Sequence, residues 1–527
     1  MAVLSARYGL IGGLAPIEYY DQRMDRERAG ELRGPATDTL LRWSRDHGEV
    51  SLVLGKDYLS AFAMDHLRDK GVQAAVVGGA IGMKLNWLSL FLQGMHTELA
   101  RPTAPEPTPE RPLYFLPDWD DMLDVDYDFR RDEFSCSHKR GRNEQHIVQV
   151  MQPRRICDGV LVSLAQHVSS KGVLKKFAPD DPASLAPRSV RQVFGVSADQ
   201  WVFGDCGAFS YVDKDEPVIT TEQAVSLYHL HGFDFGASVD HIPVPEIVTP
   251  SGKKTLSAAK QRRRVKLTKS NAEDFIGLHK RKKCTFIPVG IIQGLSAKEY
   301  GRQLPEYLEM GYRHLAIGGL VPRSDKEIVE IVRAVKKAVP AGRPQPWIHL
   351  LGVFRPRIQG ELRELGVTSF DSATYFRKAW LRSGQNYLGA DGKWYAAIRV
   401  PMTADGRTRK KLEGSGLAIE EIAEMERLAL EALHGYGEGR VALAEALEAV
   451  TVYDRLLNRS DEAESGLEAA YRRTLEERPW ERCDCPVCRE VGIDVVIFRG
   501  YNRNKRRGAH NTMMLYGLLR GAGGSRC

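Results

Sequence analysis

Short runs of apolar residues alternate with longer amphipathic stretches along most of this 527-residue chain. Seven of the apolar runs have the length of β-strands. They lie at 159–163, 201–205, 235–240, 286–293, 314–318, 347–352 and 367–371. Between several of them, apolar residues spaced three and four apart predict helices, for example over 298–309 and 325–339.

This repeated alternation of strand and helix predicts the α/β fold class. A parallel sheet of this length closes most simply as a (β/α)8 TIM barrel, in which catalytic residues lie at the carboxyl ends of the strands. Four polar residues fall at such ends, namely Asp205, Asp240, Gln293 and Asp371. We therefore expect these four side chains to share one end of the barrel.

Two regions depart from the alternation. Residues 101–112 contain five prolines and predict a stiff, extended linker. Residues 418–457 have only helical periodicity and predict a hairpin of two helices, broken at Gly435, Gly437 and Gly439. The expected parts are a small amino-terminal α/β domain (1–100), the linker (101–112), the barrel (113–400), a helical insertion (401–470) and a zinc-binding subdomain (471–527).

Composition narrows the class of protein. Hydrophobic residues make up 43% of the chain and charged residues 27%, as in ordinary globular proteins. No apolar run is long enough to span a bilayer and no secretory leader begins the chain, so we expect a cytoplasmic protein without a membrane partner. The net charge of +7 is compatible with a polyanionic partner but does not require one.

Three cysteines and a histidine near the carboxyl end have the composition of a metal site. Cys483, Cys485 and Cys488 lie within six residues, and His510 follows on a predicted helix. A disulfide is the alternative, but the other five cysteines are scattered singly, which is typical of a reducing compartment. Four protein ligands leave no open coordination position, so Zn²⁺ here would be structural.

The spacing Cys-x-Cys-x-x-Cys with a later histidine resembles the zinc subdomain of the tRNA-guanine transglycosylase superfamily. The segment from Phe203 to Phe209, FGDCGAF, is similar to the Asp-Ser-Gly-Gly-Phe motif of that superfamily, with Cys206 and Ala208 as departures. The resemblance implies that Asp205 is the general acid/base and that Phe209 stacks on the purine-like base. Taken alone, Asp205 is better explained as a simple turn residue.

Three further segments carry the same resemblance. By it, Asp240 accepts hydrogen bonds from the guanine-like edge of the base, where a carboxylate meets two adjacent donors. The segment ending in Gln293 and Gly294 resembles Val-Gln-Gly-Gly, although Leu295 replaces its last glycine. The remaining implied substrate-binding residues are Gly318, Gly319 and Leu320, whose backbone lies beside the base.

Asp371, in Ser369-Phe-Asp-Ser-Ala373, resembles the Phe-Asp-Cys motif of the family nucleophile. Its carboxylate would attack the anomeric carbon while the base leaves, forming a covalent glycosyl-enzyme intermediate. Two inversions at that carbon then give net retention. The alternative is an N-cap for a helix over 373–381.

The residues after Asp371 distinguish branches of the superfamily. The tRNA enzymes continue with Pro-Thr-Arg, whereas this chain has Ser372-Ala-Thr-Tyr-Phe-Arg-Lys-Ala-Trp380. From Leu113 onward the chain resembles the DpdA family of DNA 7-deazaguanine transglycosylases. That resemblance implies exchange of guanine in DNA for 7-cyano-7-deazaguanine, with DNA and the deazaguanine base as partners. A homodimer, or partner proteins of a DNA-modification system, is left open.

Two alternatives to this function stay open. One is the same base exchange on tRNA, and the other is a noncatalytic nucleic-acid-binding accessory subunit. The amino-terminal residues around Leu4, Tyr8 and Gly9 weakly resemble a small α/β family related to YaaA, which assigns residues 1–100 no definite role.

An enzyme of this kind must reach a base that is flipped out of a duplex or already unpaired. Basic side chains should then hold the phosphates. A solvated charged surface is the alternative for any such run. The predicted contacts are Arg262, Arg263, Arg264 and Lys266 in one run, and Arg503, Lys505, Arg506 and Arg507 in a second run beside the cysteine cluster.

Overall fold

The computed structural model divides the chain into two compact units. The described residues up to Val76 belong to the first unit and those from Arg111 onward to the second. The predicted linker at 101–112 lies outside the described residues except for its last two positions. The structure describes residues 2–12, 18, 21–45, 50–72, 74–76, 111–118, 121–136, 144–167, 189–197, 199–249, 252–381, 384–412, 416–457 and 461–520.

Eight parallel strands close into a barrel in the second unit, which confirms the predicted fold class. Each of the seven predicted runs contains one strand, and the eighth strand, β5, follows the proline-rich segment directly. The strands are β5 (Leu113–Pro117), β8 (Gly159–Ser163), β9 (Trp201–Asp205), β10 (Phe235–Ala237), β13 (Ile287–Ile292), β14 (His314–Ile317), β15 (Trp347–Leu350) and β16 (Ser369–Asp371).

Side chains alternate between the inside and the outside of the barrel, as the pleat of a strand requires. Inward-facing residues of seven strands form a separate apolar cluster that includes Phe115, Phe203, Phe235 and Trp347. The outward-facing residues pack against the helices in a much larger cluster. The barrel is therefore filled by side chains, most of them apolar.

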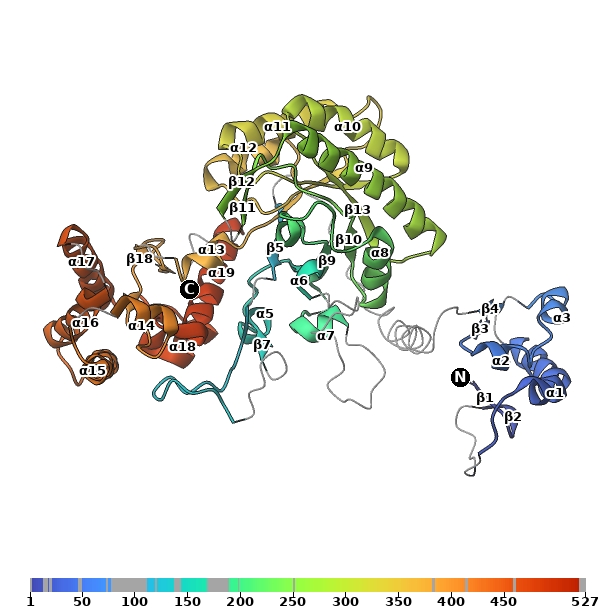
Figure 1. Cartoon of the computed structure of the whole chain (residues 1–527), viewed down its shortest axis with the longest axis horizontal. Helices are drawn as coiled ribbons and strands as arrows, with labels where there is room; N and C mark the ends of the chain where they lie inside the picture. The colour runs from blue at the N-terminus through green and yellow to red at the C-terminus, as the bar shows by residue number, and fades with distance from the viewer. Residues whose placement is uncertain are drawn as a thin grey trace. The chain divides into compact units, whose positions relative to one another are not determined.

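Helices surround the strands, as Figure 1 shows for α8 to α12. The predicted helices at 298–309 and 325–339 are α10 and α11, and Ser324 and Glu327 form a capping box that begins α11. The helices of the barrel are α6 (Leu164–His167), α7 (Val190–Phe194), η2 (Ala208–Tyr211), α8 (Thr221–Leu230), α9 (Ala258–Arg281), α10 (Ala297–Met310), α11 (Asp325–Lys337), η3 (Pro356–Ile358), α12 (Gln359–Glu364) and α13 (Thr374–Lys378).

Two excursions leave the barrel at the carboxyl ends of its strands. The first follows β5 and the second, an antiparallel hairpin, precedes α9. Their elements are β6 (Met122–Leu123), β7 (Gln145–His146) and α5 (Ile147–Val150), then β11 (Glu246–Thr249) and β12 (Gly252–Thr255).

The carboxyl-terminal part of the second unit holds the insertion and the cysteine cluster. Helix α19 packs on α13, so the cysteine-rich part joins the barrel directly after Asp371 (Figure 1). Its elements are β17 (Tyr387–Leu388), β18 (Trp394–Tyr395), β19 (Ile398–Arg399), α14 (Gly406–Leu412), α15 (Ile419–Gly437), α16 (Leu443–Leu457), α17 (Asp461–Glu477), α18 (Pro486–Val491), η4 (Gly492–Val496), β20 (Ile497–Phe498) and α19 (Gly500–Leu519).

The predicted break of the insertion is wrong in detail. Gly435 and Gly437 lie inside α15, where a Cβ would meet Val441 at 2.5 Å and Ile493 at 2.9 Å, so they allow close packing. Only Gly439, with φ of +76°, makes the turn. A third helix, α17, follows and runs across the boundary that we predicted between residues 470 and 471.

The amino-terminal unit has a small core of its own, which includes Leu4, Leu32, Leu40 and Phe62. Strands β1 (Ala2–Ser5) and β2 (Gly9–Gly12) form an antiparallel hairpin, and β3 (Val50–Leu52) pairs in parallel with β4 (Ala74–Val76). The helices are α1 (Arg26–Ser44), α2 (Lys56–Leu59) and α3 (Met64–Asp69). Within the described parts of both units, no helix combines the length and the apolar character that crossing a membrane requires.

Candidate active site and metal centre

Asp371 ends β16 and is 6% exposed. The backbone N–H of Gly352 donates to its Oδ1 over 2.7 Å, and Nε2 of His349 lies 3.1 Å from the same oxygen. The N-cap of α13 is Ala373, so the predicted alternative role of Asp371 as a helix cap is wrong. The carboxylate is instead fixed by groups from the neighbouring strand β15 and the loop after it.

Asp205 ends β9 at the same end of the barrel and is partly exposed. Its Oδ2 accepts a 2.9 Å hydrogen bond from the N–H of Gly207, which has φ of +82°. Burial, together with the smaller effect of the charges of Asp240 and Asp371, raises the pKa of Asp205 to about 8. The three carboxylates are thus close enough to influence one another.

Asp240 follows β10 and is 2% exposed. Its Oδ1 accepts from the Cys206 thiol over 2.9 Å, and its Oδ2 accepts from Nε2 of Gln293 over 2.7 Å. Burial raises the pKa of Asp240, and these two hydrogen bonds oppose the rise. Cys206, a departure from the family motif, therefore acts as a hydrogen-bond donor to the base-binding candidate.

Gln293 lies against the two glycines after β14. Its Oε1 is buried and has no hydrogen-bond partner within the described part of the chain. A Cβ at Gly318 would come within 2.2 Å of Gln293 Nε2, and one at Gly319 within 2.6 Å of Oε1. Both positions therefore require glycine if Gln293 is to keep this position.

The other predicted substrate-binding residues differ in what they expose. Phe209, on η2, is 56% exposed, so its ring is available to stack on a ligand. The Leu320 side chain is completely buried in the outer core, which leaves only its backbone for contact. A Cβ at Gly294 would meet the ring of Tyr300 at 2.9 Å, so this glycine allows close packing.

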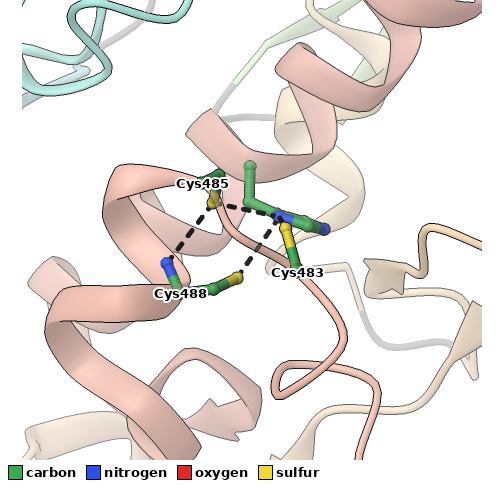
Figure 2. Close-up of side chains that lie close together, drawn as sticks. Cys483, Cys485 and Cys488 are labelled. Carbon is green, nitrogen blue, oxygen red and sulfur yellow. Dashed lines mark hydrogen bonds between the residues drawn. The ribbon is translucent and has the colours of Figure 1, made fainter. Parts of the chain in front are cut away.

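The three cysteines and the histidine converge as predicted. The ligand atoms of Cys483, Cys485, Cys488 and His510 all lie within 4.8 Å of one another, and all four residues are buried. Figure 2 shows the three thiols turned toward one another at the start of α18, where Cys485 is the N-cap. All three are free of disulfides, so that alternative is wrong.

The geometry of the cluster fits a tetrahedral metal. His510 Nδ1 lies 3.6, 3.6 and 3.4 Å from the sulfur atoms of Cys483, Cys485 and Cys488. Zinc bonds of about 2.3 Å to sulfur and about 2.1 Å to nitrogen give tetrahedral edges of about 3.6 Å. His510 Nε2 donates to the carbonyl of Leu388 over 2.8 Å, so Nδ1 is the ring atom left for the metal. The cluster is therefore consistent with a zinc site.

Whole-sequence comparison identifies characterised proteins that resemble this chain. A DNA-guanine transglycosylase from Salmonella montevideo is 34% identical over 407 residues, which cover 77% of this chain and 96% of that protein. The chain belongs to the guanine transglycosylase family. The family model described as Queuine tRNA-ribosyltransferase matches residues 163–395 of this transglycosylase, from the end of β8 to β18.

The tRNA enzymes of the family match a smaller share of the chain. A tRNA-guanine(15) transglycosylase from Pyrococcus furiosus is 26% identical over 290 residues, 52% of this transglycosylase and 44% of the relative. The enzyme of the same name from Thermococcus onnurineus is 24% identical over 301 residues, 54% of this chain and 46% of the relative. The family activity is guanine base exchange by transglycosylation, carried out by pentosyltransferases.

The prediction that the second basic run contacts nucleic acid is wrong. Arg503, Lys505, Arg506 and Arg507 lie on α19 and are at most 5% exposed. Arg507, for example, donates to the carbonyls of Ala379, Val495 and Ile497. A buried guanidinium needs such acceptors to offset its lost hydration, and here they connect the transglycosylase barrel to the cysteine-rich part.

The residues of the first predicted basic run lie partly on the surface and partly in the interior. Arg262, Arg263 and Lys266 are exposed on α9, and Arg263 forms an ion pair with Glu216. Arg264 is 4% exposed, so its predicted contact with phosphate is wrong. Its guanidinium donates to the carbonyls of Ile242, Val212 and Lys214. Arg264 thereby ties the loop after Asp205 to the loop after Asp240.

A second group of potential metal ligands was missed by the sequence analysis. Asp118, Asp121 and His146 are buried with ligand atoms within 4.8 Å of one another. The N–H of Val148 donates to Nδ1 of His146, so the ring proton is on Nε2, which lies 2.9 Å from Asp121 Oδ2. His146 Nε2 and both Asp121 carboxylate oxygens are buried without a hydrogen-bond partner in the described part of the chain, so their contact is that of an ion pair only.

Proposed function

We propose that this transglycosylase exchanges guanine in DNA for a 7-deazaguanine base, 7-cyano-7-deazaguanine. The observation that supports DNA is the 34% identity to a DNA-guanine transglycosylase across 96% of that protein's length. The tRNA enzymes align with less than half of their own length and at 24–26% identity. The absence of a Pro-Thr-Arg segment after Asp371 supports the same choice.

The first half of the reaction removes guanine. One carboxylate oxygen of Asp371 attacks the anomeric carbon of the extruded nucleotide, so a carbon–oxygen bond forms as the glycosidic carbon–nitrogen bond breaks. The electron pair of the broken bond stays on guanine. Asp205, whose pKa is raised to about 8, is protonated near neutral pH and donates that proton to the leaving base.

The second half inserts the new base. Asp240 and the unpartnered Oε1 of Gln293 accept hydrogen bonds from the donor edge of the deazaguanine, and the exposed ring of Phe209 stacks on it. Asp205, now a carboxylate, takes the proton from the ring nitrogen that attacks the anomeric carbon. The bond to Asp371 breaks, and the sugar returns to its original configuration.

The cysteine cluster has a structural role in this proposal. Zinc held by Cys483, Cys485, Cys488 and His510 has four protein ligands and no position for substrate, so no step of the exchange passes through it. It joins the start of α18 to α19, and α19 packs on α13 immediately after the nucleophile. The buried, closely spaced thiols also support location in a reducing compartment such as the cytoplasm.

The remaining basic side chains of α9 are proposed to contact the phosphate backbone. Arg262, Arg263 and Lys266 are exposed, and α9 follows the loop that carries Asp240. Duplex DNA presents no base that a barrel can enclose, so the target nucleotide must leave the stack while the backbone stays bound. Exposed cations beside the site stabilise that arrangement.

The test compares the two polymers directly. Purified protein is incubated with isotope-labelled 7-cyano-7-deazaguanine and either duplex DNA or a tRNA transcript, and the nucleosides are separated by mass spectrometry. We expect label in deoxynucleosides only. Label in tRNA alone would establish the tRNA alternative, and tight binding to either polymer without exchange would support an accessory subunit. Asp371→Asn is the inactive control.

A further inference from the structure

The two oxygens of the Asp371 carboxylate have different surroundings. Both hydrogen bonds that fix the side chain, from Gly352 N–H and from His349 Nε2, end on Oδ1. Oδ1 thus has two N–H donors and cannot turn toward a substrate without losing them. The attacking oxygen of the proposed nucleophile is therefore Oδ2.

His349 belongs to a hydrogen-bonded chain that begins inside the barrel. The indole Nε1–H of Trp347 donates to Ser369 Oγ over 2.7 Å, and Ser369 Oγ lies 2.9 Å from His349 Nδ1. Indole nitrogen is a donor only, so the serine oxygen accepts from it and its own proton is free to point at Nδ1. An unprotonated Nδ1 places the ring proton on Nε2, which faces the Asp371 carboxylate.

The surroundings of the ring hold it in this orientation. His349 is completely buried, and its ring makes edge contacts with Phe115 at 5.7 Å and with Phe203 at 4.8 Å between centroids. Both phenylalanines belong to the inner apolar cluster of the barrel. Rotation of the imidazole would push it into that cluster and break contacts at both nitrogens.

We propose that His349, held by Ser369 and Trp347, is a positioning residue that fixes Asp371 Oδ1 and so presents Oδ2 to the anomeric carbon. This inference rests on the proposed role of Asp371 as nucleophile. His349 does not touch the substrate. It acts by restricting the nucleophile to one geometry, and a misplacement of about 1 Å lowers a rate by about 100-fold.

The test uses two substitutions that differ in whether a hydrogen-bond donor remains. His349→Phe keeps an aromatic ring and removes the donor, whereas His349→Gln keeps an N–H donor near the position of Nε2. We expect His349→Phe to slow formation of the covalent intermediate about 100-fold, with KM for DNA changed less than about 3-fold. His349→Gln should recover at least about 10-fold of that loss, because the donor to Oδ1 is restored.

Ser369→Ala tests the hydrogen-bonded chain without altering the imidazole ring, and it changes the side-chain volume little. Without the serine proton, the imidazole can exchange its tautomer. We therefore expect Ser369→Ala to lower the trapping rate, but less than His349→Phe does. Thermal melting of each variant is measured in parallel. If His349→Phe does not fold, Ser369→Ala and His349→Gln still decide the question. A wild-type trapping rate in Ser369→Ala would overturn the inference, and so would equal losses in His349→Gln and His349→Phe.

Failure of the wild-type protein to form any covalent intermediate would instead overturn the proposed function. The two failures are distinguishable. The positioning role of His349 is tested by the trapping rates of the variants relative to that of the wild-type protein, and this comparison requires that the wild-type protein forms the intermediate.

Discussion

Asp205 and Asp371 end two strands of one barrel, yet their surroundings equip them for different chemistry. Two N–H donors, one of them on a buried histidine, fix Asp371, while Asp205 is partly exposed and lies near two other carboxylates. In many enzymes, two carboxylates with such different surroundings have different roles, one in acid–base catalysis and the other as the nucleophile.

The raised pKa of Asp205 predicts a pH dependence. A carboxyl group with a pKa of about 8 is protonated below that pH and loses its proton above it, so it is a general acid only on the acidic side. The rate of intermediate formation should be flat below about pH 8 and fall about tenfold per pH unit above it. Single-turnover trapping across pH 6 to about 10 measures this profile.

Asp205→Asn is the matched variant for that profile. It keeps the size of the side chain and cannot donate an acidic proton, so the rate should be low at every pH and the alkaline limb should disappear. An alkaline limb that persists in Asp205→Asn would assign the titration to another group.

At the residue scale, motifs predicted the residues of the candidate site but not the residues that hold them in position. Asp205, Asp240, Gln293 and Asp371 each stand at a strand end next to a recognisable segment. His349 and Ser369 are polar residues within apolar strands, and nothing in the local sequence shows that they meet. Only the parallel pairing of β15 with β16, which sets His349 opposite Ser369, brings them together.

At the scale of elements, α19 shows why a basic run is a weak signal. Its cations form a basic run beside the cysteine cluster, but the helix is buried on several sides. Burial of a charge is decided by tertiary packing, which a local run does not contain. The strands were easier to predict because each apolar run is continuous. Strand β5 has the same length as β8 and β9, but it was missed because it directly follows prolines and ends in Pro117.

Substitution of Arg507 should destabilise the protein. Arg507→Ala removes the donors to three buried carbonyls and leaves a cavity, which should lower the free energy of unfolding by about 3 kcal/mol. Chemical denaturation followed by circular dichroism measures the change. Arg262→Ala, on the exposed side of α9, is the matched control and should change stability by less than about 0.5 kcal/mol. Equal effects of the two substitutions would contradict the structural role of α19.

The exposed cations of α9 should affect DNA binding and not stability. Replacing Arg262, Arg263 and Lys266 together with serine should weaken DNA binding and reduce the slope of log K against log salt by about 2 to 3. Binding isotherms at several salt concentrations give the slope. An unchanged slope would leave these side chains as a solvated surface.

At the scale of the whole molecule, the cysteine cluster connects distant parts of the sequence. Cys483 and His510 are separated by 27 positions, and the helix that carries His510 packs against α13. A four-ligand zinc site contributes to folding directly, because the ligands are brought together only in the folded chain.

Removal of the metal should therefore lower stability as well as activity. We expect one zinc per chain by elemental analysis, a lower Tm after chelation, and loss of exchange that follows the loss of folded protein. Cys485→Ser should reproduce the effect at full zinc concentration. Full zinc content in this variant would remove Cys485 from the ligand set.

The most direct measurement is to map the covalent intermediate. Wild-type protein is mixed with guanine-containing duplex DNA in the absence of free base, denatured, digested and analysed by mass spectrometry. The account predicts a sugar adduct on the peptide that contains Asp371, and none when Asp371→Asn is used. An adduct on any other residue, or exchange that proceeds at the wild-type rate in Asp371→Asn, would contradict it.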